Sequence, residues 1–187
     1  MTADKKEIYF VTGNKDKLRE AEQILKDYTV TQITMELPEL QGTPKQVAEQ
    51  KTQMAFKEVQ KPIFVDDTAL SCEALNGMPG VYIKDFLNAI KQEGIVKMLQ
   101  PFNNNNATAI CSIGYCDTQG TKVFIGKCKG TIVSPRTSGN GHAHGWDPIF
   151  QAEGYNKTFA ELTSEEKNEI SHRKRALEML REFLKNK

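Results

Sequence analysis

The feature that most constrains the fold of this chain is the passage from an apolar strand into a helix within residues 8–25, "IYFVTGNKDKLREAEQIL". The apolar run ends abruptly at residues 12–14 (Thr-Gly-Asn), and a helical pattern with apolar residues on one side begins at once. The first turn of that helix carries Lys15 and Lys17. A helix N-terminus is already partly positive, so each lysine there costs roughly 0.3–1 kcal/mol. The segment therefore predicts a strand followed by a helix. The presence of two unfavourable lysines in the first turn of that helix has to be explained.

A second helix and two further strands follow in the order typical of an α/β protein. Thr43, the proline after it and Gln46 form a helix start with a capping box, which predicts a helix over residues 44–59. Residues 29–35 alternate as a strand does. Residues 62–67 are predicted to be a short strand that is apolar on both faces, as central parallel strands are.

The second half of the chain has a different pattern. Residues 82–102 are expected to form two short helices that are broken at Gly94. "ATAICSIGYC" and "KVFIGKCKGTIV" predict a hairpin with its turn at residues 117–120, and a last helix covers about 172–184. Together these segments predict an α/β fold with a mixed central sheet and flanking helices, in a single domain over residues 1–187.

Composition limits the classes of function. The chain has 187 residues, 39% of them hydrophobic and 26% charged, which suits one sizeable core. A net charge of +1 argues against non-specific binding to nucleic acid or membrane surfaces, and no apolar stretch approaches the ~20 residues of a membrane span. The charged N-terminal segment does not resemble a signal peptide. The four cysteines form no CxxC pair or zinc spacing, and Cys116 is the one expected at the surface. We therefore expect a cytoplasmic protein with no nucleic-acid or membrane partner.

Charged residues follow the predicted strands where a ligand would bind. In open α/β sheets the site lies beyond the carboxyl ends of the strands, where residues 12–14, the loop that holds Glu39, and residues 66–68 are expected to meet. Three carboxylates would then lie near the two lysines of the first helix. Mg²⁺ takes a few carboxylates with phosphate oxygens, and a helix N-terminus favours an anion. This arrangement indicates a magnesium-bound polyphosphate. The alternative is that the lysines are solvated and offset by Asp16.

Two cations interrupt the apolar stripes of predicted helices. Lys51 lies four residues after Val47 and three before Met54, and Arg173 lies at the N-terminal end of the stripe on the last helix. A cation on an apolar face usually extends its charged end to solvent, which is the simpler interpretation for each residue. Both could also point to the proposed phosphate edge. The residues favour phosphate chemistry and do not by themselves name a substrate.

Five segments, taken in order, resemble the inosine triphosphate pyrophosphatase (Ham1-like) family. They are "FVTGNKDKLREAEQIL", "LPELQG", "VDDTALSCEALNGMPGVYIKDFL", "GWDPIF" and "EKNEISHRKRALEML". The likeness runs from about residue 8 to residue 184, and its short motifs are specific only in combination. It implies an elongated, two-lobed α/β fold in a homodimer. It also implies a Mg²⁺-dependent enzyme, with Mn²⁺ possible, that hydrolyses the α–β bond of ITP, dITP and XTP to the monophosphate and pyrophosphate.

The resemblance also assigns roles to residues of this chain. Asp67, Asp66 and Lys17 are the implied catalytic residues, with either aspartate able to orient the attacking water, and Glu39 and Asp67 are the implied Mg²⁺ ligands. Thr12, Asn14 and Lys17 are implied to hold the triphosphate, with Lys51 near the phosphates. The further implied substrate contacts are Gly13, Lys15, Asp16, Asp67, Thr68 and Lys84. The implied contacts near the base comprise His144, Gly145, Trp146, Asp147, Lys167, His172 and Arg173. The family usually has Phe where this chain has His144, whose imidazole is also flat.

Other classes of function remain open at this point. A nucleotide sensor could use the same lysines without turnover, and a related pyrophosphatase could act on a modified pyrimidine or methylated nucleotide. An RNA-binding module would need a basic face with interleaved aromatic residues, against which the net charge of +1 argues. Residues 142–144 (His-Ala-His) lack a third ligand nearby and favour a flexible loop over a metal site. Trp146 is either a core residue or an aromatic wall for a base.

Overall fold

The computed structural model describes residues 5–138 and 145–187. The chain divides into two compact units. Unit 1 comprises Met1–Asp67, Cys111–Gly126 and Arg173–Lys187, and unit 2 comprises Thr68–Ile110 and Lys127–His172. The assignment of one domain to residues 1–187 stays a prediction. Within the described ranges, no helix has the length and apolar character needed to cross a bilayer.

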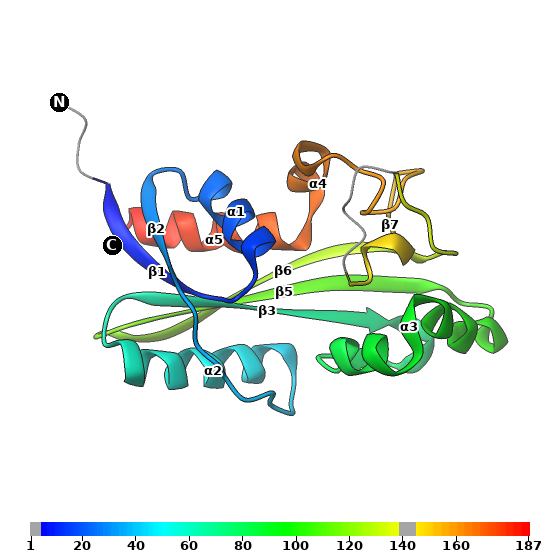
Figure 1. Cartoon of the computed structure of the whole chain (residues 1–187), viewed down its shortest axis with the longest axis horizontal. Helices are drawn as coiled ribbons and strands as arrows, with labels where there is room; N and C mark the ends of the chain where they lie inside the picture. The colour runs from blue at the N-terminus through cyan, green and yellow to red at the C-terminus, as the bar shows by residue number, and fades with distance from the viewer. Residues whose placement is uncertain (1–4, 139–144) are drawn as a thin grey trace. The chain divides into compact units, whose positions relative to one another are not determined.

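The first part of the chain alternates strands and helices as predicted (Figure 1). The elements are β1 (Lys6–Val11), α1 (Lys15–Ile24), β2 (Tyr28–Ile33), α2 (Pro44–Val59) and β3 (Ile63–Cys72). The capping box predicted at the start of α2 is confirmed, since the Thr43 side chain accepts a hydrogen bond from the Gln46 backbone N–H. β1 pairs in parallel with both β2 and β3, which places the carboxyl end of β1 at a central position in the sheet.

β3 is longer than the predicted strand over residues 62–67: it continues to Cys72, so residues 66–68 do not mark its carboxyl end as expected. Its parallel pairing with β1 ends at the Val11–Val65 pair, where β1 itself ends. β3 nevertheless continues to Cys72, since β5 is its other neighbour in the sheet and the short antiparallel strand β4 (Pro79–Gly80) pairs with it at Leu70 and Ser71. Asp66 is therefore the first residue of β3 beyond its ladder with β1.

The predicted hairpin is confirmed as β5 (Asn106–Asp117) and β6 (Gly120–Ile132), neighbouring strands joined by two residues. β6 also pairs antiparallel with β7 (Phe150–Ala152). The strand order is β2-β1-β3-β5-β6-β7, with β4 beside β3, so parallel and antiparallel pairs share one sheet. The mixed central sheet predicted from the sequence is confirmed, and β3, β5 and β6 contribute residues to both units.

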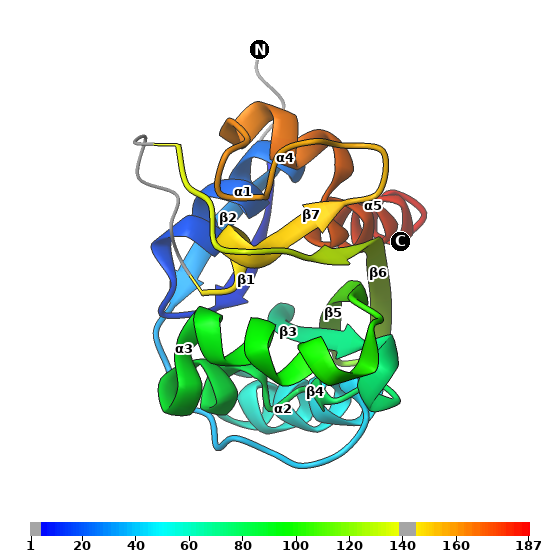
Figure 2. The ribbon, with the colours of Figure 1, turned by 90° about the vertical axis from the view of Figure 1, so that its right-hand side faces the viewer.

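α3 (Ile83–Leu99) contains a break at Lys91, so the prediction of a break at Gly94 was wrong by three residues. Lys91 has φ 59° and ψ −177°, a backbone conformation that is rare outside glycine. Gly94 serves packing instead, because a Cβ there would lie 2.5 Å from the Cβ of Ile90. Figure 2 shows α3 of unit 2 in green.

The remaining helices follow the sequence closely. α4 (Ser164–Ile170) begins at a capping box in which the Thr163 side chain accepts from the Glu166 backbone N–H, and α5 (His172–Lys185) matches the predicted last helix. The 3₁₀ helices are Glu73–Leu75, Gln100–Phe102 and Asp147–Ile149.

Unit 1 has helices on both faces of its part of the sheet, which confirms the predicted flanking helices (Figure 1). α1 and α5 pack with Phe10 and Phe64 on one face, whereas α2 packs on the other. α2 lies so close to β5 that any side chain at Gly114 would collide with the Thr52 hydroxyl. Cys116, expected at the surface, is buried beside Ala55 of α2, so that expectation was wrong.

Candidate active site

The turn after β1 is built to start α1. The Asn14 side-chain oxygen accepts hydrogen bonds from the backbone N–H groups of Asp16 (2.9 Å) and Lys17 (3.1 Å), and the Thr12 hydroxyl accepts from the Asn14 N–H (3.1 Å). An N-cap of this kind contributes about 1 kcal/mol and fixes the first turn of the helix. Gly13 and Lys15 are exposed, so this turn presents backbone and a cation to solvent.

Lys17 is not simply solvated. Its ammonium lies 2.7 Å from Asp66 Oδ1 and donates to the Asp66 carbonyl oxygen at 3.0 Å. Asp16, which the alternative interpretation placed opposite the lysines, forms an ion pair with Arg19 at 2.5 Å. The contact with β3 therefore holds the Lys17 ammonium just beyond the end of β1.

Asp66 is the centre of a buried ion-pair cluster. Its side chain is fully buried, Arg173 Nε donates to its Oδ2 at 2.7 Å, and the Cys111 thiol lies 3.4 Å from the same oxygen. Burial alone would raise the pKa of Asp66, but the charges of Arg173 and Lys17 outweigh it and hold the pKa well below its usual range. Burial and the Asp66 charge raise the pKa of Cys111 well above its ordinary value. Asp66 is thus an anion, and Cys111 a neutral thiol.

Glu20 belongs to this cluster, although the sequence reasoning missed it. Its Oε2 accepts from Arg173 Nη1 at 2.7 Å. The available signal was its position on α1, three residues after Lys17, because residues three apart share a helix face. Arg173 itself is buried and directs these two N–H groups at carboxylates.

A second cluster joins Lys51 to the two predicted metal ligands. Lys51 Nζ donates to Glu39 Oε2 and to Asp67 Oδ1, each at 2.9 Å. Burial would lower the pKa of Lys51, but the neighbouring Asp67 and Glu39 charges raise it above its ordinary value. The Lys51 side chain therefore ends in an ion pair, not in solvent as the simpler interpretation had it. The carboxylates of Glu39 and Asp67 therefore lie next to the same ammonium group in unit 1.

The donor set fits Mg²⁺ better than a metal held entirely by protein. Glu39 and Asp67 supply two hard carboxylates, the number that Mg²⁺ commonly takes when phosphates and water complete its shell. Among the described residues, no group of three or more His, Cys, Asp or Glu side chains could hold a metal ion. Any ion at this point would therefore depend on a ligand for its remaining oxygens.

Unit 2 holds the described residues predicted near the base except Arg173, which belongs to unit 1. Lys167 Nζ lies 2.6 Å from Asp147 Oδ2, which joins α4 to the short 3₁₀ helix after Trp146. The Phe159 ring stacks on His172, with centroids 5.9 Å apart and an interplanar angle of 7°. Trp146 packs against both rings and is 7% exposed, which favours the core interpretation of this residue over a free aromatic wall.

The other predicted contacts of unit 2 are spread along its chain. Thr68 is half-buried in β3, and Lys84 is exposed in the first turn of α3. The Gly145 carbonyl accepts a hydrogen bond from Gln92 Nε2 at 2.8 Å. His144 lies outside the described residues.

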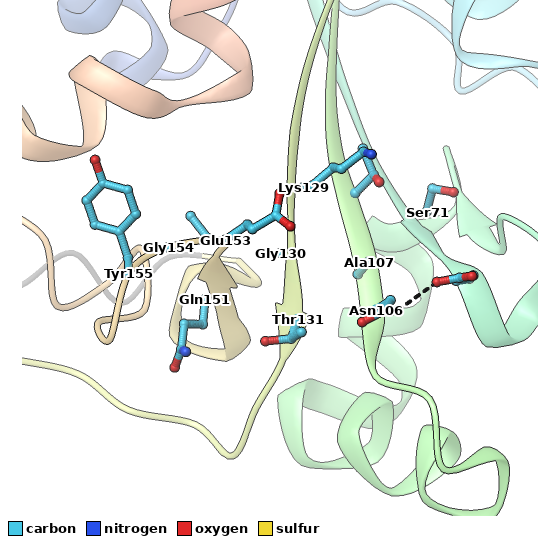
Figure 3. Close-up of a pocket in the computed structure, with 13 residues that line it drawn as sticks. Ser71, Asn106, Ala107, Lys129, Gly130, Thr131, Gln151, Glu153, Gly154 and Tyr155 are labelled. Atoms are coloured by element: carbon cyan, nitrogen blue, oxygen red, sulfur yellow. Dashed lines mark hydrogen bonds between the residues drawn. The ribbon is translucent and has the colours of Figure 1, made fainter.

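Unit 2 also contains an open polar pocket of about 660 Å³ (Figure 3). Its lining includes Lys129, Gln151 and Glu153, together with Asn106, which donates to Glu73 at 2.9 Å. None of the residues predicted from the sequence to bind substrate or metal lines this pocket.

The sequence profile of the Ham1 family matches residues 8–183. The chain belongs to the Ham1 family. It is 46% identical to the inosine triphosphate pyrophosphatase of Yarrowia lipolytica, with 96% of each chain covered. It is 44% identical to the inosine triphosphate pyrophosphatase of Emericella nidulans, with 96% of this chain and 97% of the relative covered.

Solved structures of Ham1 proteins have the same fold. The Ham1 protein of Staphylococcus aureus matches with a TM-score of 0.83 and 30% identity over 97% of this chain and 99% of its own. The HAM1 protein of Coxiella burnetii matches with a TM-score of 0.85 and 28% identity over 97% of this chain and 100% of its own. The resemblance seen in the five sequence segments is therefore confirmed, and it extends over nearly the whole chain.

Proposed function

We propose that this chain is a nucleoside triphosphate pyrophosphatase that hydrolyses the α–β phosphoanhydride of ITP, dITP and XTP. The observation that carries the proposal is the pairing of Lys17 and Lys51 with neighbouring carboxylates of β3, just beyond the end of β1. Ammonium groups held in this way provide fixed positive charge for a phosphate chain without further rearrangement. The names of the fungal relatives support the same substrate class.

Mg²⁺, with Mn²⁺ as the substitute, is the metal that we propose for Glu39 and Asp67. Their carboxylates converge on Lys51, and Glu39 is exposed, so the pair is accessible from solvent. When bound, the ion would neutralise phosphate charge and polarise the phosphoryl oxygens.

Asp67 is a better candidate than Asp66 for orienting the attacking water. Asp66 is fully buried and places one oxygen on Lys17 and the other on Arg173. Asp67 contacts Lys51 through Oδ1, and its side chain is 17% exposed. In the proposed step, Asp67 accepts a proton as water attacks the α-phosphorus, and pyrophosphate leaves with its charge stabilised by the two lysines.

We propose that base selection depends on hydrogen-bond donors in unit 2. Hypoxanthine and xanthine carry a keto acceptor at position 6, whereas adenine carries an amino donor there. Lys167, held by Asp147, can only donate, and His172 is the second candidate donor. A site that is built to pair with one group rejects an analogue that cannot pair by ~10⁴–10⁵. The site would have to exclude guanine by rejecting the 2-amino group of that base.

Product analysis over a panel of triphosphates tests the proposal. The panel contains ITP, dITP, XTP, ATP, GTP and modified pyrimidine and methylated purine triphosphates, each with Mg²⁺, with Mn²⁺ and with EDTA. We expect inosine and xanthine monophosphates with pyrophosphate, and no turnover in EDTA. Release of inorganic phosphate would contradict cleavage of the α–β bond. Tight ITP binding without turnover would indicate a sensor, and turnover of a pyrimidine or methylated substrate alone would indicate a related nucleotidase.

Matched lysine variants separate the site from the rest of α2. Lys51→Met removes the ammonium that joins Glu39 and Asp67, and should lower kcat by about 10²–10³. Lys57→Met changes an exposed lysine of the same helix and should leave kcat unchanged. The resemblance also implies a homodimer and the composition indicates a cytoplasmic protein, and we propose both properties. Sedimentation velocity measures the oligomeric state, and cell fractionation measures the location.

A further inference from the structure

Four charged side chains of unit 1 form one connected cluster. Lys17 contacts Asp66 Oδ1, Arg173 contacts Asp66 Oδ2, and Glu20 contacts Arg173 Nη1, each at 2.7 Å. The cluster carries two positive and two negative charges. Glu20 therefore supplies the second negative charge through its contact with Arg173.

The four side chains differ in burial. Asp66 is fully buried, Arg173 is 9% exposed, Glu20 is 16% exposed and Lys17 is 21% exposed. A buried charge that loses its partner must be neutralised or reach water. If one negative charge is removed, two cations compete for Asp66, and the cation nearest to solvent is the one that can leave. That cation is Lys17.

We propose that Glu20 is a positioning residue for Lys17. By occupying one side of the Arg173 guanidinium, Glu20 balances its charge and leaves Asp66 Oδ1 for the Lys17 ammonium. Both residues lie on α1, whose first turn is fixed by the Asn14 cap, so a change at Glu20 leaves the start of the helix intact. The inference rests on the proposed function in one respect, that Lys17 contacts the triphosphate.

The direct test compares Glu20→Gln with Glu22→Gln. Both substitutions remove one negative charge from α1 with little change of shape, and Glu22 is exposed. For Glu20→Gln we expect kcat/KM for ITP to fall about ten-fold with a rise in KM, because a phosphate contact is displaced. A purely structural loss would lower the active fraction, and hence kcat, at unchanged KM. We expect Glu22→Gln to match the wild type.

A double-mutant cycle identifies the residue through which Glu20 acts. In a Lys17→Ala background, Glu20→Gln should cause no further fall in kcat/KM, since the ammonium that it positions is already gone. If the fall in the Lys17→Ala background equals the fall in the wild type, Glu20 acts independently of Lys17 and the proposal is overturned.

Crystal structures of the two variants give a readout that does not depend on turnover. In Glu20→Gln the Lys17 ammonium should be displaced from Asp66, and in Glu22→Gln it should remain there. An intact Lys17–Asp66 pair in Glu20→Gln overturns the positioning role even if activity falls. If the wild type fails to hydrolyse ITP while Lys17 moves as expected, the proposed substrate is wrong and the positioning role stands.

Discussion

Removing the buried Asp66 carboxylate is expected to destabilise the protein more than removing an exposed carboxylate of unit 1. Asp66→Asn keeps the shape of the side chain and leaves Lys17 and Arg173 without their shared anion. Loss of one partner from a buried ion pair costs about 3–5 kcal/mol. Arg173 keeps Glu20, and Lys17 is partly exposed, so the lower end of about 3 kcal/mol applies.

That loss corresponds to a fall in Tm of roughly 6–12 °C for a chain of this length. Urea denaturation is the quantitative assay, with circular dichroism and the fluorescence of the single buried Trp146 recorded together. Coincidence of the two curves tests for two-state unfolding, without which no single free energy applies.

Asp27→Asn is the matched control, because Asp27 also pairs with an arginine, Arg181, but at the surface. Exposed pairs contribute about 0–1 kcal/mol. If Asp66→Asn costs no more than Asp27→Asn, the buried cluster around Asp66 does not stabilise the fold, and the reasoning from burial is refuted.

Three further predictions concern metal, base choice and pH. Glu39→Ala and Asp67→Ala should each lower kcat drastically with an unchanged circular dichroism spectrum, and near-wild-type turnover at saturating Mg²⁺ would remove that residue from the site. Arg173→Ala should lower kcat/KM for ITP and ATP by similar factors, since its guanidinium donates to Asp66 and Glu20; a selective loss on ITP would make Arg173 a base contact. Burial raises the pKa of Cys72 from 9.0 to about 11. The stabilisation that comes from keeping this thiol neutral is therefore fully present below pH 9, and about 3 kcal/mol of the free energy of unfolding is lost as the pH rises to 11. Urea curves at pH 8 and 10.5 should therefore differ less for Cys72→Ala than for the wild type, and equal differences would contradict this.

Local signals were sufficient for the helix starts. The capping box at Thr43 was predicted because a cap involves residues only three apart, whose backbone and side chains meet in any folded context. The break in α3 was misplaced for the opposite reason. Glycine is the residue most expected to break a helix, but here the absence of a side chain at Gly94 leaves room for Ile90, and the break falls at Lys91.

The sequence by itself determined the order of strands and helices, the mixed sheet and the family, because these depend on periodicity, caps and short motifs. It also identified Lys17, Lys51 and Arg173 as cations in unusual positions. Only the tertiary structure decided which charges pair, since Arg173 and Asp66 are 107 residues apart and meet through the packing of α5 on the sheet. Likewise, β3 runs through Asp66 to Cys72 beside β5 and β4, which follow it in the chain, and no local pattern encodes those partners. Propensity acts over a few residues, whereas the strength of a buried ion pair depends on the exclusion of water by the whole core.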